Sequence, residues 1–217
     1  VAQTGTLVPI NFLTSDSLNS AFVPQYKKML EISRDHAQTL FWSLVFIFFC
    51  FSAVLCSALW GAANLWVALI APGLNADTSA MAVDMLRVMG FGIPFYLMSA
   101  LLIFLGMAND DFVPMAVRSS IQNIGLIGGA ILAFILNDAI FLAWGFSYAY
   151  VIFSIWVLVR TYQAGKLFWP KTWTWVSVKV VVMAFARTLR PLLMLPVMLQ
   201  GNIAVERAVA SLIGLSV

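Results

Sequence analysis

Long apolar runs separated by short polar breaks dominate the chain of 217 residues. A helix needs roughly 20 apolar residues to cross the hydrocarbon core of a bilayer, and an open strand would leave its backbone groups unpaired in lipid. The pattern therefore predicts an all-α fold, a polytopic transmembrane helical bundle with about six spans. The predicted spans are residues 7–23, 41–70, 81–107, 113–136, 139–159 and 191–217.

Two segments depart from this simple apolar pattern. The first predicted span contains Asn11, Asp16 and Asn19, so its polar side must face protein or a water-filled path; a re-entrant segment or a loop is the alternative. Residues 169–190 alternate tryptophan, valine and phenylalanine with lysine and arginine. That alternation predicts a helix lying in the membrane interface, with its basic side chains toward the headgroups.

Composition excludes a soluble protein. The chain is 62% hydrophobic and 10% charged, with a mean hydropathy of +0.96, whereas soluble domains carry about 25% charged residues. The net charge of +3 does not indicate nucleic acid, because the basic residues form no patch with interleaved aromatic residues. All of them except Arg87 and Arg207 fall at breaks on one side of the predicted membrane, which predicts that these breaks are cytoplasmic.

Charged residues inside predicted spans are candidates for function, because such charges are costly in lipid unless they face a cavity or a partner. Glu206 and Arg207 lie near the middle of the last predicted span, and Asn202 lies about one turn earlier. Neighbouring residues on a helix point in different directions, so we expect these two charges to meet different partners. A structural ion pair with another helix is the alternative.

Arg87 is the other cation inside a predicted span, and Asp84 precedes it at i, i+3 spacing. This spacing allows the two side chains to pair on one helix face. Anchoring of the helix near the interface is therefore the alternative to a substrate contact.

The fourth predicted span carries amides and small residues. We expect Gln122 and Asn123 to hydrogen-bond to neighbouring helices, and Asn123 is also a candidate substrate contact. Gly125, Gly128 and Gly129 are small enough to permit close helix packing.

Catalytic and metal-binding patterns are absent from the sequence. His36, the only histidine, is predicted to lie in a cytoplasmic loop, and the six-residue spacing of Cys50 and Cys56 matches no metal motif. Neither HExxH nor GxSxG occurs. We therefore predict a protein that is not an enzyme and that needs no cofactor or metal.

The stretch LTSDSLNSAFVPQY at residues 13–26 resembles the end of the second helix in MurJ/MviN-type lipid II flippases and related polysaccharide flippases. Lipid II flippases carry arginines just before this stretch, where this chain has Ile10 and Asn11. Another polyprenyl-linked oligosaccharide is therefore an alternative to lipid II. Further similar segments follow in the same order along the chain: residues 71–73, Leu86, Arg87, Pro94, residues 99–102, Asn109, Phe112, Pro114, residues 123–124, residues 142–145, Gly165 and residues 202–211.

The resemblance implies the multidrug/oligosaccharidyl-lipid/polysaccharide exporter superfamily, in which two helical lobes surround a central cavity. The chain, which starts at Val1 and stops within an apolar run, would be a fragment that holds helices two to seven. We expect one transmembrane domain over residues 1–217, with the N-terminal lobe at 1–168, an interfacial helix at 169–190 and the start of the second lobe at 191–217.

The function implied by the resemblance is a flippase of the bacterial inner membrane. It would move a polyprenyl-diphosphate-linked saccharide, lipid II or a related cell-envelope precursor, by alternating access. A cation-coupled drug antiporter of the same superfamily is one alternative, and a non-transporting scaffold for envelope-synthesis enzymes is another. Expected partners are the saccharide lipid, membrane lipid and, for the scaffold, those enzymes. The expected substrate-binding residues are Arg87, Arg207, Glu206, Asp16, Asn202 and Asn123.

Overall fold

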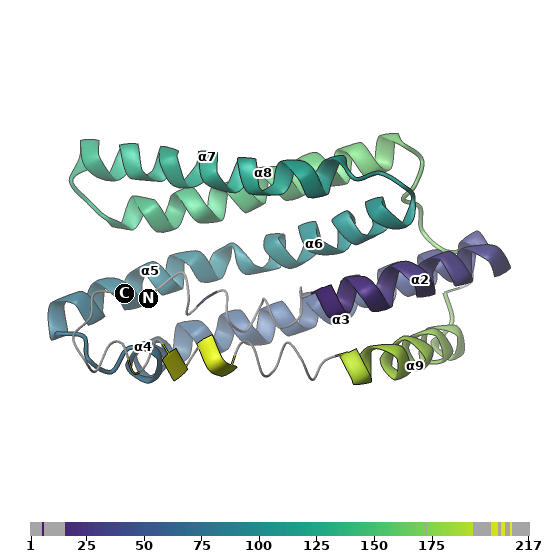
Figure 1. Ribbon diagram of the computed structural model, residues 1–217, viewed down its shortest axis with the longest axis horizontal. Coiled ribbons are helices and arrows are strands. Elements are labelled where there is room, and N and C mark those ends of the chain that lie inside the picture. Colours follow the sequence, from purple (N-terminus) through teal and green to yellow (C-terminus); the bar gives the residue numbers. More distant parts are fainter. Residues whose placement is uncertain are drawn as a thin grey trace.

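The computed structural model describes residues 6, 16–171, 173–192, 201–203, 205, 206 and 209, and each element within these ranges is a helix. The elements form an elongated bundle with the α7–α8 hairpin along one side (Figure 1). The predicted all-α bundle is confirmed. In chain order the helices are α2 (Asp16–Ile32), α3 (Arg34–Gly61), α4 (Ala63–Ile70), α5 (Ala76–Phe91), α6 (Ile93–Ala108), α7 (Val113–Leu136), α8 (Ile140–Gln163) and α9 (Trp175–Leu192).

Among the described residues, α3, α7 and α8 are long and apolar enough to cross a membrane, and α5 with α6 makes a fourth, bent span. The bounds of α7 coincide with the predicted span 113–136. The predicted span 81–107 bends by 45° between α5 and α6, next to Pro94, which lacks a backbone N–H. Most of the last predicted span, 191–217, and most of the first lie outside the described residues.

Three local predictions are wrong. The predicted span 41–70 is interrupted between α3 and α4 at Ala62. Helix α2 continues past residue 23 to Ile32, so Lys27 lies on a helix and not in a loop. His36 is exposed as expected, but it lies in the first turn of α3. That helix starts early because the Ser33 hydroxyl accepts a hydrogen bond from the Asp35 N–H at 3.2 Å.

Helix α6 lies at the centre of the bundle, between α3 and the α7–α8 hairpin (Figure 1). Nearly all of its residues are buried, and Leu97, Leu101 and Leu102 are at most 1% exposed. Such an all-round apolar helix is the expected centre of a bundle. Its neighbours contribute Phe22, Phe41, Phe146 and Phe153 to the same core.

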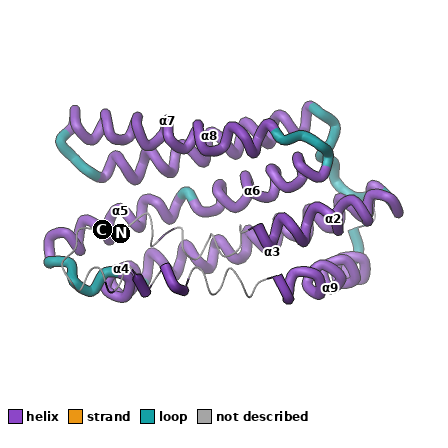
Figure 2. Tube along the Cα trace, viewed as in Figure 1, coloured by secondary structure: helices purple, strands orange, loops and turns teal. Residues whose placement is uncertain are grey.

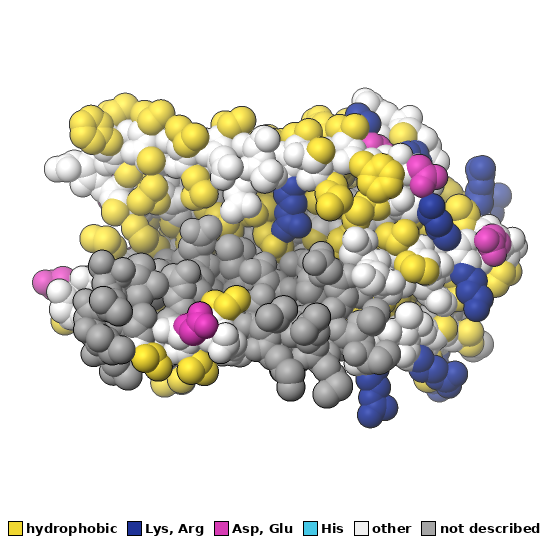
Figure 3. Space-filling model, viewed as in Figure 1, with side chains coloured by type: hydrophobic (Ala, Val, Ile, Leu, Met, Phe, Trp, Pro, Cys, Tyr) yellow, Lys and Arg dark blue, Asp and Glu magenta, His cyan; other side chains and the backbone are white. Residues whose placement is uncertain are grey.

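The outer face of α7 is apolar and exposed. Ile124 is 68% exposed and Phe134 is 87% exposed, and similar residues cover much of the hairpin surface (Figure 3). Water would disfavour so large an apolar surface, whereas hydrocarbon tails are as apolar as the side chains themselves. This face is therefore a lipid-facing surface or a contact with further protein.

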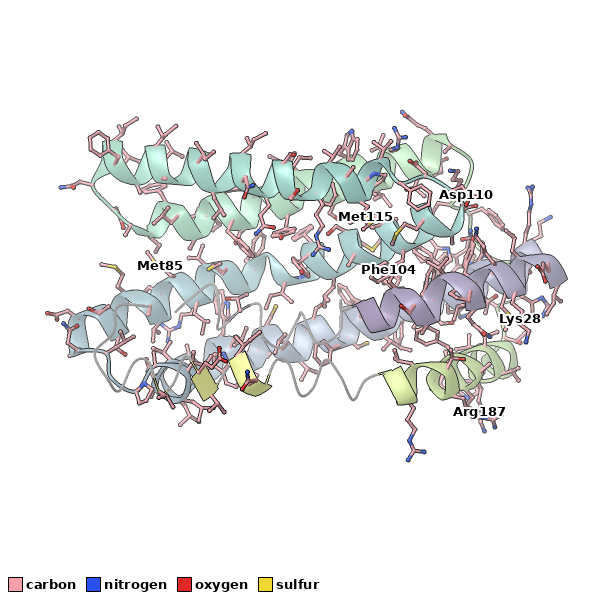
Figure 4. All side chains as sticks on the ribbon, viewed as in Figure 1. Lys28, Met85, Phe104, Asp110, Met115 and Arg187 are labelled. Atoms are coloured by element: carbon pink, nitrogen blue, oxygen red, sulfur yellow. The ribbon has the colours of Figure 1, made fainter. Side chains whose placement is uncertain are left out.

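Basic residues gather at one end of the bundle, which we name the basic end. The loops lie at the two ends of the helices (Figure 2), and dark-blue Lys and Arg side chains cluster toward one of them (Figure 3). Lys28, Asp110 and Arg187 mark this end (Figure 4). The loops at the opposite end, residues 71–75 and 137–139, contain no Lys or Arg. This asymmetry indicates that the basic end is cytoplasmic.

Main-chain contact between α7 and α8 occurs at three glycines. A Cβ added to Gly129 would lie 2.7 Å from the Phe141 carbonyl oxygen, and one added to Gly125 would lie 2.7 Å from the Gly145 carbonyl oxygen. A Cβ on Gly145 would lie 2.8 Å from the Gly129 Cα. Real Cβ atoms do not approach so closely, so these helices pack through small residues as predicted. A Cβ added to Gly128 would instead meet no atom within 4 Å.

We expect Gly145→Ala to destabilise the protein by about 1–3 kcal/mol, because overpacking must push α7 away from α8. The matched change Gly128→Ala adds the same methyl group to open space and should be neutral or stabilising by up to about 1 kcal/mol, since alanine favours helix. Thermal unfolding of the purified variants in detergent measures both. Equal melting temperatures for the two variants would contradict this packing.

Candidate functional site

The structure pairs Arg87 with Asp84 on α5. The guanidinium lies 3.5 Å from the carboxylate, and the two side chains are 43% and 62% exposed. The main-chain oxygen of Arg87 also accepts a hydrogen bond from the indole of Trp60 at 3.0 Å. The expected i, i+3 pair is thus present, while enough of the guanidinium remains exposed to meet a ligand.

The other predicted site residues are only partly described. Glu206 is exposed and accepts a hydrogen bond from the Asn202 amide at 2.9 Å. Arg207 lies outside the described residues, and of Asp16 only the backbone, at the start of α2, is described. Asn123 is exposed on α7.

A polar cluster that the sequence interpretation missed lies between α6, α7 and α8. The Cζ atom of Arg118 lies 4.8 Å from the ring centroid of Tyr96 on α6, a cation–π distance. Among the described residues, no carboxylate lies within ion-pair distance of Arg118. The charge pattern groups Arg118 with the basic residues at breaks, but α7 begins at Val113, so this cation lies more than one turn inside the helix.

Tyr150 on α8 connects the members of this cluster. Its hydroxyl donates a hydrogen bond to Oε1 of Gln122 at 2.8 Å, as expected for an interhelical contact of Gln122. Its ring meets Tyr96 edge to face, with the centroids 4.7 Å apart, and its hydroxyl also lies beside the Arg118 guanidinium. Tyr96 and Tyr150 are buried, whereas Arg118 and Gln122 are partly exposed. We name these four residues the Arg118 cluster.

An apolar groove of about 540 Å³ runs along α7 and α8 beyond the cluster. Arg118 lies on the same stripe of α7 as four residues that line this groove, because positions 118, 121, 125, 128 and 132 follow the alternating 3–4 spacing of one helix face. Trp144, Tyr148 and Ile152 line it from α8. The groove therefore begins about one turn along α7 from Arg118.

Ion pairs join the helices at the basic end. Arg160, in the last turn of α8, donates two hydrogen bonds to the Asp111 carboxylate, at 3.0 and 3.2 Å. Asp111 lies in the turn between α6 and α7, and its side chain is 14% exposed. The bonds from Arg160 hold the pKa of Asp111 below its usual range, because they favour the ionised carboxylate. The neighbouring Asp110 pairs with Lys27 of α2 at 3.0 Å.

The segment after α8 adds hydrogen bonds at this end. The Gln38 amide of α3 donates to the Lys166 carbonyl at 2.8 Å and to the Tyr26 hydroxyl at 3.1 Å. The Trp42 indole donates to the Phe168 carbonyl at 2.9 Å. Together with the ion pairs, these bonds connect α2, α3, α8 and the α6–α7 turn; we name them the basic-end network.

A family model described as "Lipid II flippase MurJ" matches residues 10–217, nearly the whole chain. The chain belongs to the MurJ lipid II flippase family. Comparison with individual curated proteins and with solved structures gave no match. The MurJ family consists of membrane transporters that act in peptidoglycan biosynthesis, so the predicted class, a transporter, is confirmed. No group of three or more His, Cys, Asp or Glu that could hold a metal occurs among the described residues of this MurJ-family chain.

We expect Asp111→Asn and Arg160→Gln each to lower the melting temperature of the MurJ-family protein. The double variant should lose little more than either single variant, because both changes remove one shared interaction. A double-mutant cycle by thermal unfolding in detergent tests this, and strictly additive losses would show that the pair contributes nothing.

The same pair predicts a pH dependence. A lowered pKa means that Asp111 stabilises the folded state fully above the ordinary carboxyl value of 3.8 and loses this contribution only as the pH falls through the lowered pKa. The difference in melting temperature between the wild type and Asp111→Asn should therefore be constant from neutral pH down to about pH 5, one unit above that range. If this difference in melting temperature already shrinks between pH 7 and pH 5, the pKa of Asp111 is not lowered in the folded protein.

Proposed function

We propose that the full-length protein moves a polyprenyl-diphosphate-linked saccharide, lipid II or a related cell-envelope precursor, across the bacterial inner membrane by alternating access. The observation that carries this proposal is the family match over residues 10–217. Alternating access in exporters with two helical halves is largely a rocking of one half against the other. The saccharide and the diphosphate would cross in a polar cavity while the polyprenyl tail stays in lipid.

The basic-end network supports the rocking of one lobe as a unit. Asp111 binds Arg160 from the α6–α7 turn, Asp110 binds Lys27 of α2, and Gln38 of α3 binds the segment after α8. Rigid-body motion requires helices that stay together while the whole lobe turns. These contacts join helices that are distant in sequence, so the described helices can move together.

Arg87 and Arg207 are the proposed contacts for the diphosphate, since a guanidinium offers paired donors to phosphate oxygens. Asp84 would hold Arg87 when no substrate is bound, and the 3.5 Å distance together with the exposure of both side chains suits a pair that opens readily. Glu206, Asn202, Asp16 and Asn123 are proposed to contact the saccharide or to hold the arginines in the empty state.

The proposal is tested with the full-length protein in proteoliposomes, by following the transbilayer movement of a polyprenyl-diphosphate saccharide. We expect Arg87→Gln to slow this movement by about tenfold, the effect of one lost charge-assisted contact. The matched change Asp84→Asn removes the same ion pair but keeps the guanidinium, and it should leave the rate unchanged or raise it. Arg207→Ala should slow the movement as Arg87→Gln does.

If Asp84→Asn and Arg87→Gln slow the transbilayer movement equally, the ion pair serves only to anchor the helix. Unimpaired movement after the loss of both arginines would remove them from the substrate path. If the wild-type protein moves no such lipid despite correct insertion, the flippase proposal fails, and the drug antiporter or the scaffold takes its place.

A further inference from the structure

We propose that the Arg118 cluster binds the phosphate group of a lipid in the leaflet at the basic end of the bundle. This site differs from the proposed diphosphate contacts at Arg87 and Arg207. It does not depend on the transport activity, because a membrane phospholipid and a polyprenyl diphosphate carry the same phosphate chemistry.

The first reason is an unneutralised charge. Arg118 lies within a membrane-spanning helix, where a cation is costly unless it meets a partner. The Tyr96 ring beneath the guanidinium provides a cation–π contact at 4.8 Å, but neither tyrosine carries a charge. Among the described residues no carboxylate pairs with Arg118, so an anion from the surroundings would complete the site.

The second reason is the arrangement of donors. Arg118 and Gln122 lie at i, i+4 on α7 and thus share one helix face. The Tyr150 hydroxyl donates to Oε1 of Gln122 at 2.8 Å, which orients the amide and leaves its N–H groups available to an acceptor. An arginine fork and an amide donor one turn apart fit the several oxygens of a phosphate.

The third reason is depth in the membrane. Helix α7 has 24 residues and is therefore about 36 Å long, compared with about 30 Å for the hydrocarbon core. Arg118 follows the first residue of α7 by five positions, which places its Cα only a few ångström inside the core at about 1.5 Å per residue. The long side chain can reach the headgroup boundary from there.

The fourth reason is the apolar groove of about 540 Å³ on the same stripe of α7. A lipid whose phosphate binds Arg118 extends its chain toward the bilayer centre, which is the direction in which Ile121, Gly125 and Gly128 follow along the helix. Gly128 leaves room in this groove, because no atom lies within 4 Å of a Cβ built on it. The groove thus lies on the side of Arg118 toward which the chain of a bound lipid would extend.

The experiment measures lipid binding to the full-length protein in detergent micelles by native mass spectrometry. The probes are dioleoyl phosphatidylglycerol and a polyprenyl-diphosphate saccharide, each titrated separately. Arg118→Gln should weaken the binding of at least one probe by about tenfold, as expected for a lost charge-assisted contact. Arg34→Gln, which removes an exposed cation at the start of α3, is the matched control and should leave both affinities unchanged.

A second variant tests the groove without touching the cluster. Gly128→Leu fills the open space of the groove, so it should weaken the binding of dioleoyl phosphatidylglycerol but not that of the dihexanoyl form, whose chains are too short to reach position 128. This comparison also decides the question if Arg118→Gln does not fold.

Each outcome has a definite meaning. If Arg118→Gln weakens only the binding of phosphatidylglycerol, the cluster is a site for a membrane phospholipid. If it weakens only the binding of the saccharide lipid, the cluster lies on the substrate path. Unchanged binding of both probes by folded Arg118→Gln overturns the proposal. The proposal is also overturned if Gly128→Leu binds dioleoyl and dihexanoyl phosphatidylglycerol with the affinities of the wild type. If the protein binds lipid through Arg118 but moves no saccharide lipid, the lipid site stands and the proposed transport function fails.

Discussion

The separation of α7 and α8 is set by main-chain contact at Gly125, Gly129 and Gly145, where no side chain fits. Lipid provides no hydrophobic force to hold helices together, so close packing of small residues is one of the few available sources of association. This approach brings Gln122 within reach of Tyr150, whose ring in turn meets Tyr96 beneath Arg118. It also shapes the groove beside Gly128, so the polar cluster and the apolar groove share one cause.

The bundle separates two kinds of stabilisation along its length. Its middle is apolar and centred on α6, whereas ion pairs and hydrogen bonds concentrate at the basic end, in the basic-end network. Exposed ion pairs in water contribute little, but Asp111 is mostly covered and binds Arg160 through both carboxylate oxygens. The network thus connects helices at the membrane surface, where water can still reach their outer charges.

Apolar patterning was enough to predict the features that repeat along a helix. It located α7 to the residue, identified the glycine packing surface, and predicted a basic amphipathic helix in the region of α9. The break at Ala62 escaped it, because its adjacent signal is Gly61, and an isolated glycine is tolerated within a helical pattern. Arg118 escaped it too, because its place four residues after Pro114 groups it with the basic residues at breaks, although proline is common in the first turn of a helix.

Contacts between distant residues were beyond sequence reasoning from a single chain. Asp111 and Arg160 are 49 positions apart, and no periodic pattern connects them. The Arg118 cluster likewise combines residues from three helices, and the sequence predicts an interhelical hydrogen bond only for Gln122 among them. The substrate contacts at all six expected site residues remain predictions, and the side chains of Arg207 and Asp16 lie outside the described residues.

The most direct test is whether the full-length protein replaces the lipid II flippase of a bacterium depleted of its own. A flippase for lipid II should sustain growth and cell shape when it is produced and inserted in the inner membrane. Lysis of the depleted cells, despite verified insertion of the protein, would contradict lipid II transport as its function.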